Sequence, residues 1–423
     1  MPPMPDTEFE VVIVGAGPGG ATAAAHLARR GRRVLLLDKA RFPRDKVCGD
    51  AISGKSVDAL KRLGVMDRML AATADGRAVG SWGVTFGGPY GAEASIPLAK
   101  SKQEAAGDGA PPDPPAFIAT RLAFDQIVFD AAVEAGATVW QEATMKSLIR
   151  EGEQVVGVQV ARGGEEVEVR APIIIGADGA YSVVARELGM EQLVERHYCA
   201  GLRAYYRGVT GFREADYLEV HFVDEAMPGY FWIFPLPDGG ANVGVGMLAS
   251  EVKKRDVKLK PLLDWLVAHP RFAHRFENAE RIGPVKGFGL PLGSKPRPLA
   301  GPGWLLVGDP GSLIDPFSGE GIGNAMVSAE KAAEWADRAL AAGDFSERFL
   351  TGYGKDVLAY LGSELRLSYT MQKLGRWKWL LEKVVHKADT SPGVAHAISV
   401  MFDDEAERKK LANPLFYLKA LTS

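Results

Sequence analysis

The amino-acid sequence lacks three features that would place it in a special class: cysteine pairs, long apolar runs and an excess of charge of one sign. It has only two cysteines, Cys48 and Cys199, so a disulfide framework is not expected, and we expect Cys199 to lie in a core. No stretch offers about eighteen uninterrupted apolar residues, which excludes a membrane-spanning helix. A net charge of −3 creates no basic field that would hold nucleic acid.

These absences favour an ordinary globular protein. Residues 1–10 contain no apolar signal core, and with so little cysteine this favours a reducing cytoplasm. Contact with a membrane surface stays open. The length of 423 residues exceeds the usual size of one hydrophobic core, so we expect two domains with a helical appendage.

The strongest local pattern lies between residues 10 and 38. The apolar run Val11–Val14 is followed by the glycine turn Gly15–Gly20, an alanine-rich run and a second apolar run that ends at Asp38. This order predicts a strand, a tight turn, a helix and a second strand, which together form a nucleotide-binding unit.

Each residue type in this unit has a chemical reason. Gly15 permits the sharp exit from the strand, Gly17 lets the backbone approach a pyrophosphate, and Gly20 lets the helix pack on the sheet. Asp38 accepts from the adenosine ribose, and its charge would repel a 2′-phosphate. The pattern therefore predicts FAD or NAD rather than NADP. The alternative is a glycine turn that packs without a nucleotide.

A second glycine-rich loop, far along the chain, favours FAD. Gly308 and Asp309 follow a buried strand, and the glycines after residue 318 open a long alanine-rich helix. A nicotinamide dehydrogenase has no use for such a loop, whereas in a flavin enzyme Asp309 accepts from the ribityl hydroxyls. Amides near Gly321 and Ile322 would face the N1/C2 edge of the ring, where reduced flavin carries negative charge.

Two other residues have a functional and a plain interpretation. Asp178, in the corner Gly176–Gly179, either contacts the cofactor or only caps the following helix. Arg121, at the start of a predicted helix, either reaches the flavin phosphate or ribityl chain or lies in solvent. No metal site is predicted.

The rest of the chain shows a change of periodicity. We expect helices at 53–63, 121–135 and 252–276, a loop at 101–115, strands at 82–96, 138–149, 154–161, 165–169 and 304–307, and helix beyond 321. Alternating strands at 198–209, 217–223, 230–235 and 241–247 indicate an antiparallel sheet, and hence a second domain of a different kind.

Several of these motifs together resemble known flavoproteins. Gly15–Gly20, Asp38, Arg121, Gly176–Gly179 and Gly308–Pro310, in this order, resemble the fingerprint set of the para-hydroxybenzoate-hydroxylase-like flavoproteins. More narrowly, Phe42–Asp50 and the YxWxFP motif of Tyr230–Pro235, with its following GxG, resemble the geranylgeranyl reductase family. The resemblance extends to about Met326.

The resemblance implies an α/β, Rossmann-like FAD-binding domain with an inserted α+β antiparallel-sheet substrate domain and C-terminal helices. We assign residues 1–80, 116–190 and 285–345 to the FAD-binding domain, 81–115 and 191–284 to the substrate domain, and 346–423 to the C-terminal helical region. The resemblance also implies that the segment of Cys48 and Gly49 lies beside the isoalloxazine. We count Lys39 among the cofactor-binding residues as well.

An aromatic strand predicts where a substrate would lie. On an alternating strand, Tyr230, Trp232 and Phe234 project to one face, and Gly244 and Gly246 on the next strand leave that region uncrowded. The slot would suit an extended prenyl chain. The alternative is that these aromatic residues only pack the core of the domain.

Cys48 is the candidate for a reactive group. It follows Arg44 and Lys46, which would stabilise its thiolate if the side chains converge. We count Cys48, Tyr230 and Trp232 as catalytic, with the thiol steering substrate or taking part in proton delivery. A buried, inert cysteine is the competing interpretation.

The predicted function is an FAD-dependent reductase that saturates carbon–carbon double bonds of a prenyl chain. NAD(P)H or a small redox protein would supply electrons, because no second dinucleotide fingerprint is present. The alternative is a flavin monooxygenase or halogenase, although Tyr230–Pro235 does not spell the WxWxIP-type signature of halogenases. A flavin-free NAD-binding scaffold is a third class.

A basic amphipathic stretch lies near the C-terminal end. Its apolar stripe runs from Met371 to Ala388 at helical spacing, opposite several lysines and an arginine. Such a helix either lies on an anionic membrane surface or docks on its own protein.

Overall fold

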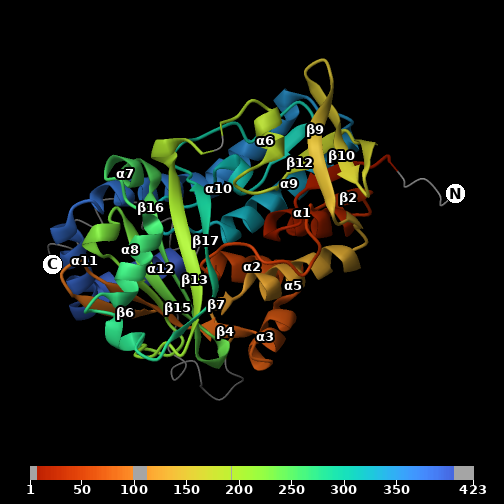
Figure 1. The fold of residues 1–423 in the computed structure, drawn as a ribbon. Coiled ribbons are helices and arrows are strands. Elements are labelled where there is room, and N and C mark those ends of the chain that lie inside the picture. The colour runs from red at the N-terminus through yellow and green to blue at the C-terminus, as the bar shows by residue number, and fades with distance from the viewer. Residues whose placement is uncertain (1–6, 99–111, 192, 404–423) are drawn as a thin grey trace.

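The computed structural model describes residues 7–98, 112–191 and 193–403. Figure 1 shows two halves, one built around a mainly parallel sheet and the other around a larger, mainly antiparallel sheet. The loop expected at 101–115 falls, up to residue 111, outside the described residues. The predicted fold class is confirmed, whereas the predicted domain boundaries stay a prediction.

The first half is organised around a six-stranded sheet. Its order is β18 (Ala300–Gly301), β19 (Trp304–Leu306), β12 (Ile173–Gly176), β1 (Val11–Val14), β2 (Val34–Leu37) and β8 (Thr138–Trp140). β1 pairs in parallel with both β2 and β12. These strands are continuous apolar runs because both faces of the sheet are covered.

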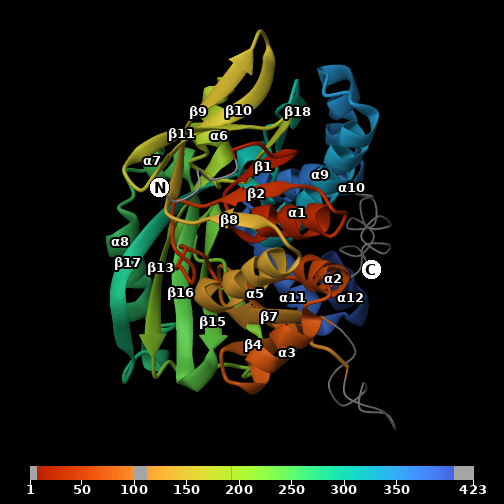
Figure 2. The same cartoon turned by 90° about the vertical axis from the view of Figure 1, so that its right-hand side faces the viewer.

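Helices cover one face of this sheet and a strand meander covers the other, as Figure 2 shows. The helices are α1 (Pro18–Ala28), α2 (Gly54–Leu63), α5 (Arg121–Glu134), α9 (Ile322–Ala342) and α10 (Glu347–Leu374), with α3 (Met66–Ala74) beside α5. The meander is β9 (Ala143–Glu151), β10 (Gln154–Arg162) and β11 (Glu165–Arg170), with α6 (Val183–Glu187). The helices predicted at 53–63 and 121–135 and the meander are confirmed.

The second half is a seven-stranded sheet. Its order is β17 (Glu280–Pro291), β13 (Tyr198–Arg207), β16 (Gly240–Leu248), β15 (Gly229–Leu236), β14 (Leu218–His221), β5 (Gly83–Gly87) and β6 (Glu93–Pro97). Helix α8 (Leu259–Ala268) packs on one face. The other face packs on a small sheet of β3 (Ala51–Ile52), β7 (Ala116–Ala119) and β4 (Ala78–Ser81).

The single helix expected over 252–276 is wrong. The chain forms α7 (Ala249–Lys254), α8 and a short 3-10 turn instead. Asp256 has a φ of 48°, in the left-handed region, and this conformation ends the first helix after Arg255.

The single amphipathic helix expected over 371–388 is also wrong. α10 ends at Leu374, with Gly375 as its C-cap, and α11 (Lys378–Thr390) starts anew, followed by α12 (Pro392–Asp403). Val385 and Ala388 are buried against β6. None of the helices in the described part of the chain is long and apolar enough to cross a bilayer.

We expect the close approach of α1 to β1 to make Gly20 irreplaceable. A Cβ at Gly20 would lie 1.8 Å from the carbonyl oxygen of Gly15, which is backbone and cannot move aside. Gly20→Ala should therefore lower the free energy of unfolding by about 1–3 kcal/mol, measured by urea denaturation.

The matched control for this change is Gly354→Ala, in the interior of α10. A Cβ there would meet its nearest atom, Cβ of Leu299, at an ordinary 3.6 Å. This variant should be as stable as the wild type or more stable, because alanine favours helix. Equal stability of the Gly20 variant would contradict the close packing.

Candidate functional site

Glycine-rich corners follow three adjacent strands of the parallel sheet. β19, β12 and β1 are neighbours, and after their carboxyl ends come Gly308, Gly176–Gly179 and Gly15–Gly20 respectively. Because carboxyl ends of parallel strands meet at one edge of a sheet, these corners form one continuous surface.

The first corner has the geometry of an anion site. Gly15 has a φ of 99°, and a Cβ on it would lie 2.4 Å from the Ala177 carbonyl oxygen. The amides of Gly17, Gly19 and Gly20 have no acceptor among the residues that the structure describes. They stand at the N-terminus of α1, where the helix dipole adds positive potential. The corner therefore fits the pyrophosphate of a dinucleotide.

Asp38 lies at the end of β2, next to this corner. One carboxylate oxygen accepts from the amide of Ala16 and the other from the amide of Ala40, each at 2.8 Å. The carboxylate thus holds the turn in place, and each oxygen keeps a lone pair for a ribose hydroxyl. Lys39, beside it, is exposed.

Two arginines share one buried carboxylate beside the turn. Arg121 is only 2% exposed and forms two hydrogen bonds with Asp125, at 2.5 and 2.7 Å. Arg44 Nη1 lies 2.7 Å from the same carboxylate, and a Cβ on Gly17 would lie 3.3 Å from Arg44 Nη2. The interpretation of Arg121 as a solvated side chain is therefore wrong.

Because two arginines share one carboxylate, this cluster has a net positive charge next to the glycine turn. Sequence reasoning did not assign Arg44 to the dinucleotide, because nothing in its local pattern indicates that it folds back onto Gly17. Arg121 and Asp125 are four residues apart on a predicted helix, and this spacing could have indicated their ion pair.

The second loop brings a carboxylate and a helix N-terminus together. Asp309 lies 3.4 Å from Lys46 Nζ, and its carboxylate lies close to Gly179 and Gly321. In the first turn of α9, the backbone amides of Ile322, Gly323 and Asn324 have no hydrogen-bond acceptor among the described residues. The arrangement suits the hydroxyl-bearing and carbonyl-bearing parts of a flavin.

The loop before α9 is fixed by polar contacts from α2. Ser53 donates to the carboxylate of Glu320, and the buried Lys55 lies 3.6 Å from it. Lys55 also donates to Asn324 at 2.7 Å. These contacts preset the first turn of α9.

Asp178 caps a helix. Its carboxylate accepts from Ser182 and from the amides of Val183 and Val184 in α6, and burial raises its pKa. Helix capping, the structural alternative for Asp178, accounts for these bonds. A direct contact with a cofactor stays a prediction.

Cys48 lies at the meeting point of the two halves. Its thiol lies close to the Arg121 guanidinium, and its carbonyl oxygen accepts from Asn242 on β16 at 2.8 Å. Arg44 and Lys46, which would stabilise the thiolate if they converged on it, pair with the carboxylates of Asp125 and Asp309. The cation beside Cys48 is Arg121, supplied by a distant part of the chain.

The aromatic strand β15 faces the Cys48 segment. Trp232 and Phe234 are 9% and 7% exposed, and a Cβ on Gly49 would lie 3.2 Å from the Phe234 ring. A Cβ on Gly244 would lie 2.2 Å from the indole of Trp232. The expectation that Gly244 leaves open space is therefore wrong, since the indole fills that space.

Tyr230 differs from its two aromatic neighbours. It is half-buried, and its hydroxyl donates to the carbonyl of Ser318, in the loop before α9. Burial raises its pKa, so the hydroxyl keeps its proton at neutral pH. Tyr230 thus ties the aromatic strand to the second glycine-rich loop. Gly246, on β16, lies beside Cys199.

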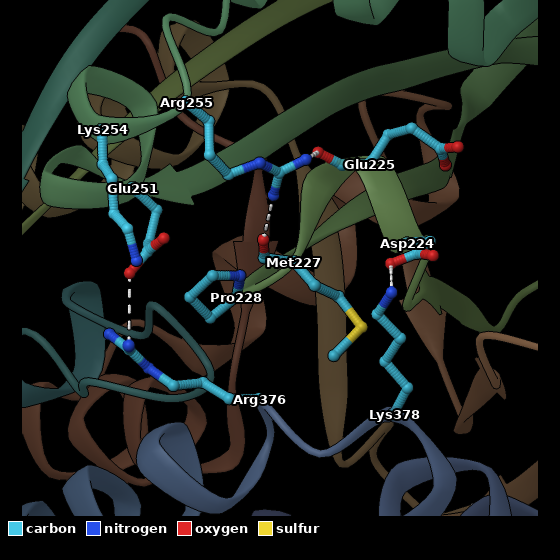
Figure 3. A pocket seen from close by; sticks show the side chains of 9 residues that line it. All are labelled: Asp224, Glu225, Met227, Pro228, Glu251, Lys254, Arg255, Arg376 and Lys378. Atoms are coloured by element: carbon cyan, nitrogen blue, oxygen red, sulfur yellow. Dashed lines mark hydrogen bonds and ion pairs between the residues drawn. The ribbon is translucent and has the colours of Figure 1, made fainter.

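A charged pocket of about 470 Å³ lies elsewhere, where the C-terminal helices meet the antiparallel sheet. Figure 3 shows Arg376 reaching Glu251 and Lys378 reaching Asp224 across it. None of the residues predicted from the sequence to bind cofactor or substrate lines it. Its ion pairs hold the α10–α11 junction against α7 and against the 3-10 turn that precedes β15.

Comparison with known proteins agrees with this geometry. Residues 8–245 match the family model described as FAD binding domain. The chain is 33% identical to a menaquinone reductase of Mycobacterium tuberculosis, covering 78% of this chain and 77% of the relative. It is 31% identical to a digeranylgeranylglycerophospholipid reductase of Methanosarcina acetivorans, covering 85% of this chain and 83% of the relative.

Solved structures share the fold. A geranylgeranyl bacteriochlorophyll reductase-like protein from Thermoplasma acidophilum has a TM-score of 0.77 at 24% identity, covering 96% of this chain and 99% of that one. The flavin-dependent brominase Bmp2 has a TM-score of 0.78 at 22% identity, covering 98% of both chains.

We expect Arg44→Ala to weaken the binding of FAD. The guanidinium beside Gly17 would make a charge-assisted bond with the pyrophosphate, and such bonds contribute about 1.5–3 kcal/mol, or roughly 10- to 100-fold in Kd. Titration of the apoprotein with FAD, followed by flavin fluorescence, measures this change.

The control is Arg41→Ala, which removes an exposed arginine from the same segment. Its Kd should stay within about twofold of the wild-type value, because an exposed charge contributes little. An unchanged Kd in the Arg44 variant would show that this arginine does not contact the dinucleotide.

Proposed function

We propose that this chain, which belongs to the FAD binding domain family and is an FAD-dependent oxidoreductase of the geranylgeranyl reductase type, reduces carbon–carbon double bonds in the prenyl chain of a lipid. The relatives named as menaquinone and digeranylgeranylglycerophospholipid reductases support a prenyl-lipid substrate. The identity of that lipid and the electron donor belong to the proposal.

The residues that would hold FAD come from the glycine-rich corners after β1 and β19 and from their neighbours. The turn at Gly17 and Arg44 would take the pyrophosphate, Asp38 the ribose, and Asp309 with the first turn of α9 the ribityl chain and ring. When bound, FAD supplies the hydride that the protein cannot. The donors of these corners are preset, so little reorganisation is needed on binding.

The chain itself would bind and orient the prenyl group. Each CH₂ removed from water contributes about 0.8 kcal/mol, so an aromatic wall holds a polyprenyl chain without polar contacts. Tyr230 is the most accessible of the three aromatic residues, and its hydroxyl is already bonded to Ser318. Its ring is therefore free to contact substrate while its polar end is satisfied.

One observation carries this proposal: the aromatic strand touches the cofactor-side segment directly. Gly49 packs against Phe234 and Trp232, and its neighbour Cys48 contacts Arg121 on the cofactor side. A substrate held by Tyr230 and Trp232 would thus lie next to the residues that the family resemblance assigns to the flavin ring. Protein groups around the ring would exclude water from the reacting carbons.

The electron donor we propose is NAD(P)H, with a small redox protein as the alternative. A flavin monooxygenase or halogenase would use the same FAD corners, and the likeness to the brominase concerns the fold alone. Oxygen separates these functions, because a reductase needs none and the other two consume it.

Anaerobic incubation with NAD(P)H and a panel of menaquinones and digeranylgeranyl lipids tests the function. We expect products heavier than the substrate by two hydrogens, or multiples of two, by mass spectrometry. Tyr230→Ala should raise the KM for the prenyl lipid, and His274→Ala, which removes an exposed side chain from a 3-10 turn, serves as control. Turnover that requires oxygen, or a product that contains it, would overturn the proposal.

An enzyme reaches a lipid substrate most directly at a membrane surface. We propose that the α10–α11 junction of this protein contacts that surface. Trp377 and Trp379 are 55% and 60% exposed and stack with ring centroids 6.4 Å apart, beside the exposed Leu374. Tryptophan favours the membrane–water interface. Arg376 and Lys378 pair with acids, as Figure 3 shows, so exposed lysines such as Lys383 would supply attraction to anionic lipid.

Replacing both exposed tryptophans tests this contact. In flotation with phosphatidylglycerol-containing liposomes, the Trp377→Ala/Trp379→Ala variant should float severalfold less than the wild type. Trp265→Ala, which removes a 42% exposed tryptophan from α8, should float as the wild type does. Equal flotation of all three proteins would exclude this surface, while changed oligomeric state in gel filtration would indicate a protein interface instead.

A further inference from the structure

We propose that Asp50 stores the proton that is added to the alkene, and that Tyr205 connects it to solvent. This inference rests on the proposed reduction, since it names the source of the second hydrogen. Asp50 follows Cys48 and Gly49 in the segment that joins the two halves of the molecule.

Asp50 is buried in an unusual way for a carboxylate. It has no exposed surface, and its φ of 67° lies in the left-handed region. Residues other than glycine adopt this region at a cost, although aspartate and asparagine tolerate it best. Such conformations concentrate at functional sites.

Only neutral groups bond to this carboxylate. Oδ2 accepts from Tyr205 Oη and from Asn242 Nδ2, both at 2.8 Å. Oδ1 is buried and has no partner among the described residues. An ionised carboxylate with one unpaired oxygen and no bonded cation is costly in a buried site, and protonation lowers this cost because it removes the charge.

The charged and titratable groups around Asp50 come from several elements. Arg203, on β13, and Arg121, on α5, attract the ionised form from a distance, and Tyr205 and Asn242 bond to it. Burial outweighs these effects and raises the pKa of Asp50 to about 6. The carboxyl group can therefore both hold and release a proton near neutral pH.

Asn242 connects Asp50 to the proposed substrate site. Its Nδ2 donates to the Cys48 carbonyl as well as to Asp50, and its Oδ1 accepts from Trp232 Nε1 at 2.9 Å. One amide thus joins the cofactor-side segment, the carboxyl group and the aromatic wall. The proton store lies directly behind the residues proposed to hold the alkene.

Tyr205 provides the route for reprotonation. It is partly exposed, and burial together with Asp50 raises its pKa, so it keeps its proton and donates it to the carboxylate. The guanidinium of Arg203 lies 3.9 Å from its ring centroid and pairs with Asp45, which also pairs with Lys286 at the surface. The hydroxyl can pass its proton inward while it takes another from water.

The step balances in atoms and charge. One alkene carbon gains a hydride from the reduced flavin, which is oxidised, and its neighbour gains the proton of Asp50. The carbon–carbon π bond breaks and two C–H bonds form. The carboxylate left behind is reprotonated through Tyr205 from water, and NAD(P)H or another reductant restores the flavin.

Asp50→Asn is a clean test, because asparagine tolerates the same φ. Its amide oxygen can accept from Tyr205 and Asn242, so the bonds survive while the ionisable group is lost. In the FAD-loaded enzyme we expect FAD affinity and KM near wild type, and kcat lower by about 10²-fold or more. The wild-type fall of kcat as pH rises past about 6 should disappear.

Two readouts without turnover accompany this variant. The infrared carbonyl band of a protonated carboxyl should be present in the wild type below a pH of about 6, lost above it and absent in the variant. A raised carboxyl pKa also means that the folded state binds more protons than the unfolded state. The stability of the wild type relative to the variant should therefore fall as the pH rises from 3.8 to about 6.

Asp238→Asn is the matched control, because it makes the same exchange at another aspartate in the left-handed region, with a φ of 59°. Asp238 is exposed and lies at the turn between β15 and β16, outside the contacts of Asp50 and Tyr205. This variant should keep the wild-type pH profile and infrared band. If the wild type reduces prenyl lipids and Asp50→Asn does so equally well, Asp50 is not the proton store. If the wild type reduces none, the proposed function itself has failed.

Discussion

The hydrogen bonds of Asn242 are the contacts on which the rest of the site depends. One side chain, placed on β16 of the larger sheet, holds the Cys48 carbonyl, the Asp50 carboxyl and the Trp232 indole. It ties the segment between Arg44 and Asp50 to the aromatic strand, and the bonds of Tyr205 to Asp50 and of Arg203 to Asp45 hold the same segment on β13. The parallel sheet supplies a preset anion site, and the antiparallel sheet supplies an apolar wall. The site arises where Asn242 joins them.

Close approach explains why so many glycines occur at this junction. Gly244 makes room for the Trp232 indole, Gly49 for the Phe234 ring and Gly20 for the Gly15 carbonyl. In each case a methyl group would occupy the position of an atom that belongs to the site. The glycines therefore act less through flexibility than through the absence of a side chain, which lets two elements carrying polar and aromatic groups meet.

Local patterns could be predicted from the sequence, and long-range contacts could not. The strand, turn and helix from Val11 to Asp38 follow from periodicity and from glycine chemistry, and the match to the FAD binding domain confirms the cofactor. The cation beside Cys48 was assigned to its neighbours in sequence, yet Arg121 supplies it from a helix far along the chain. Similarly, periodicity joined α10 and α11 into one helix, because a stripe of apolar residues does not reveal a C-cap at Gly375.

The proposed function requires that a flavin bound at the glycine-rich corners pass its electrons to a prenyl chain held against β15. A single-turnover experiment without oxygen tests it most directly, by mixing the reduced enzyme with a prenyl lipid and following the flavin absorbance. We expect the flavin to be reoxidised in step with the formation of the saturated product. A flavin that stays reduced with every prenyl lipid, and is reoxidised only when oxygen is admitted, would contradict it.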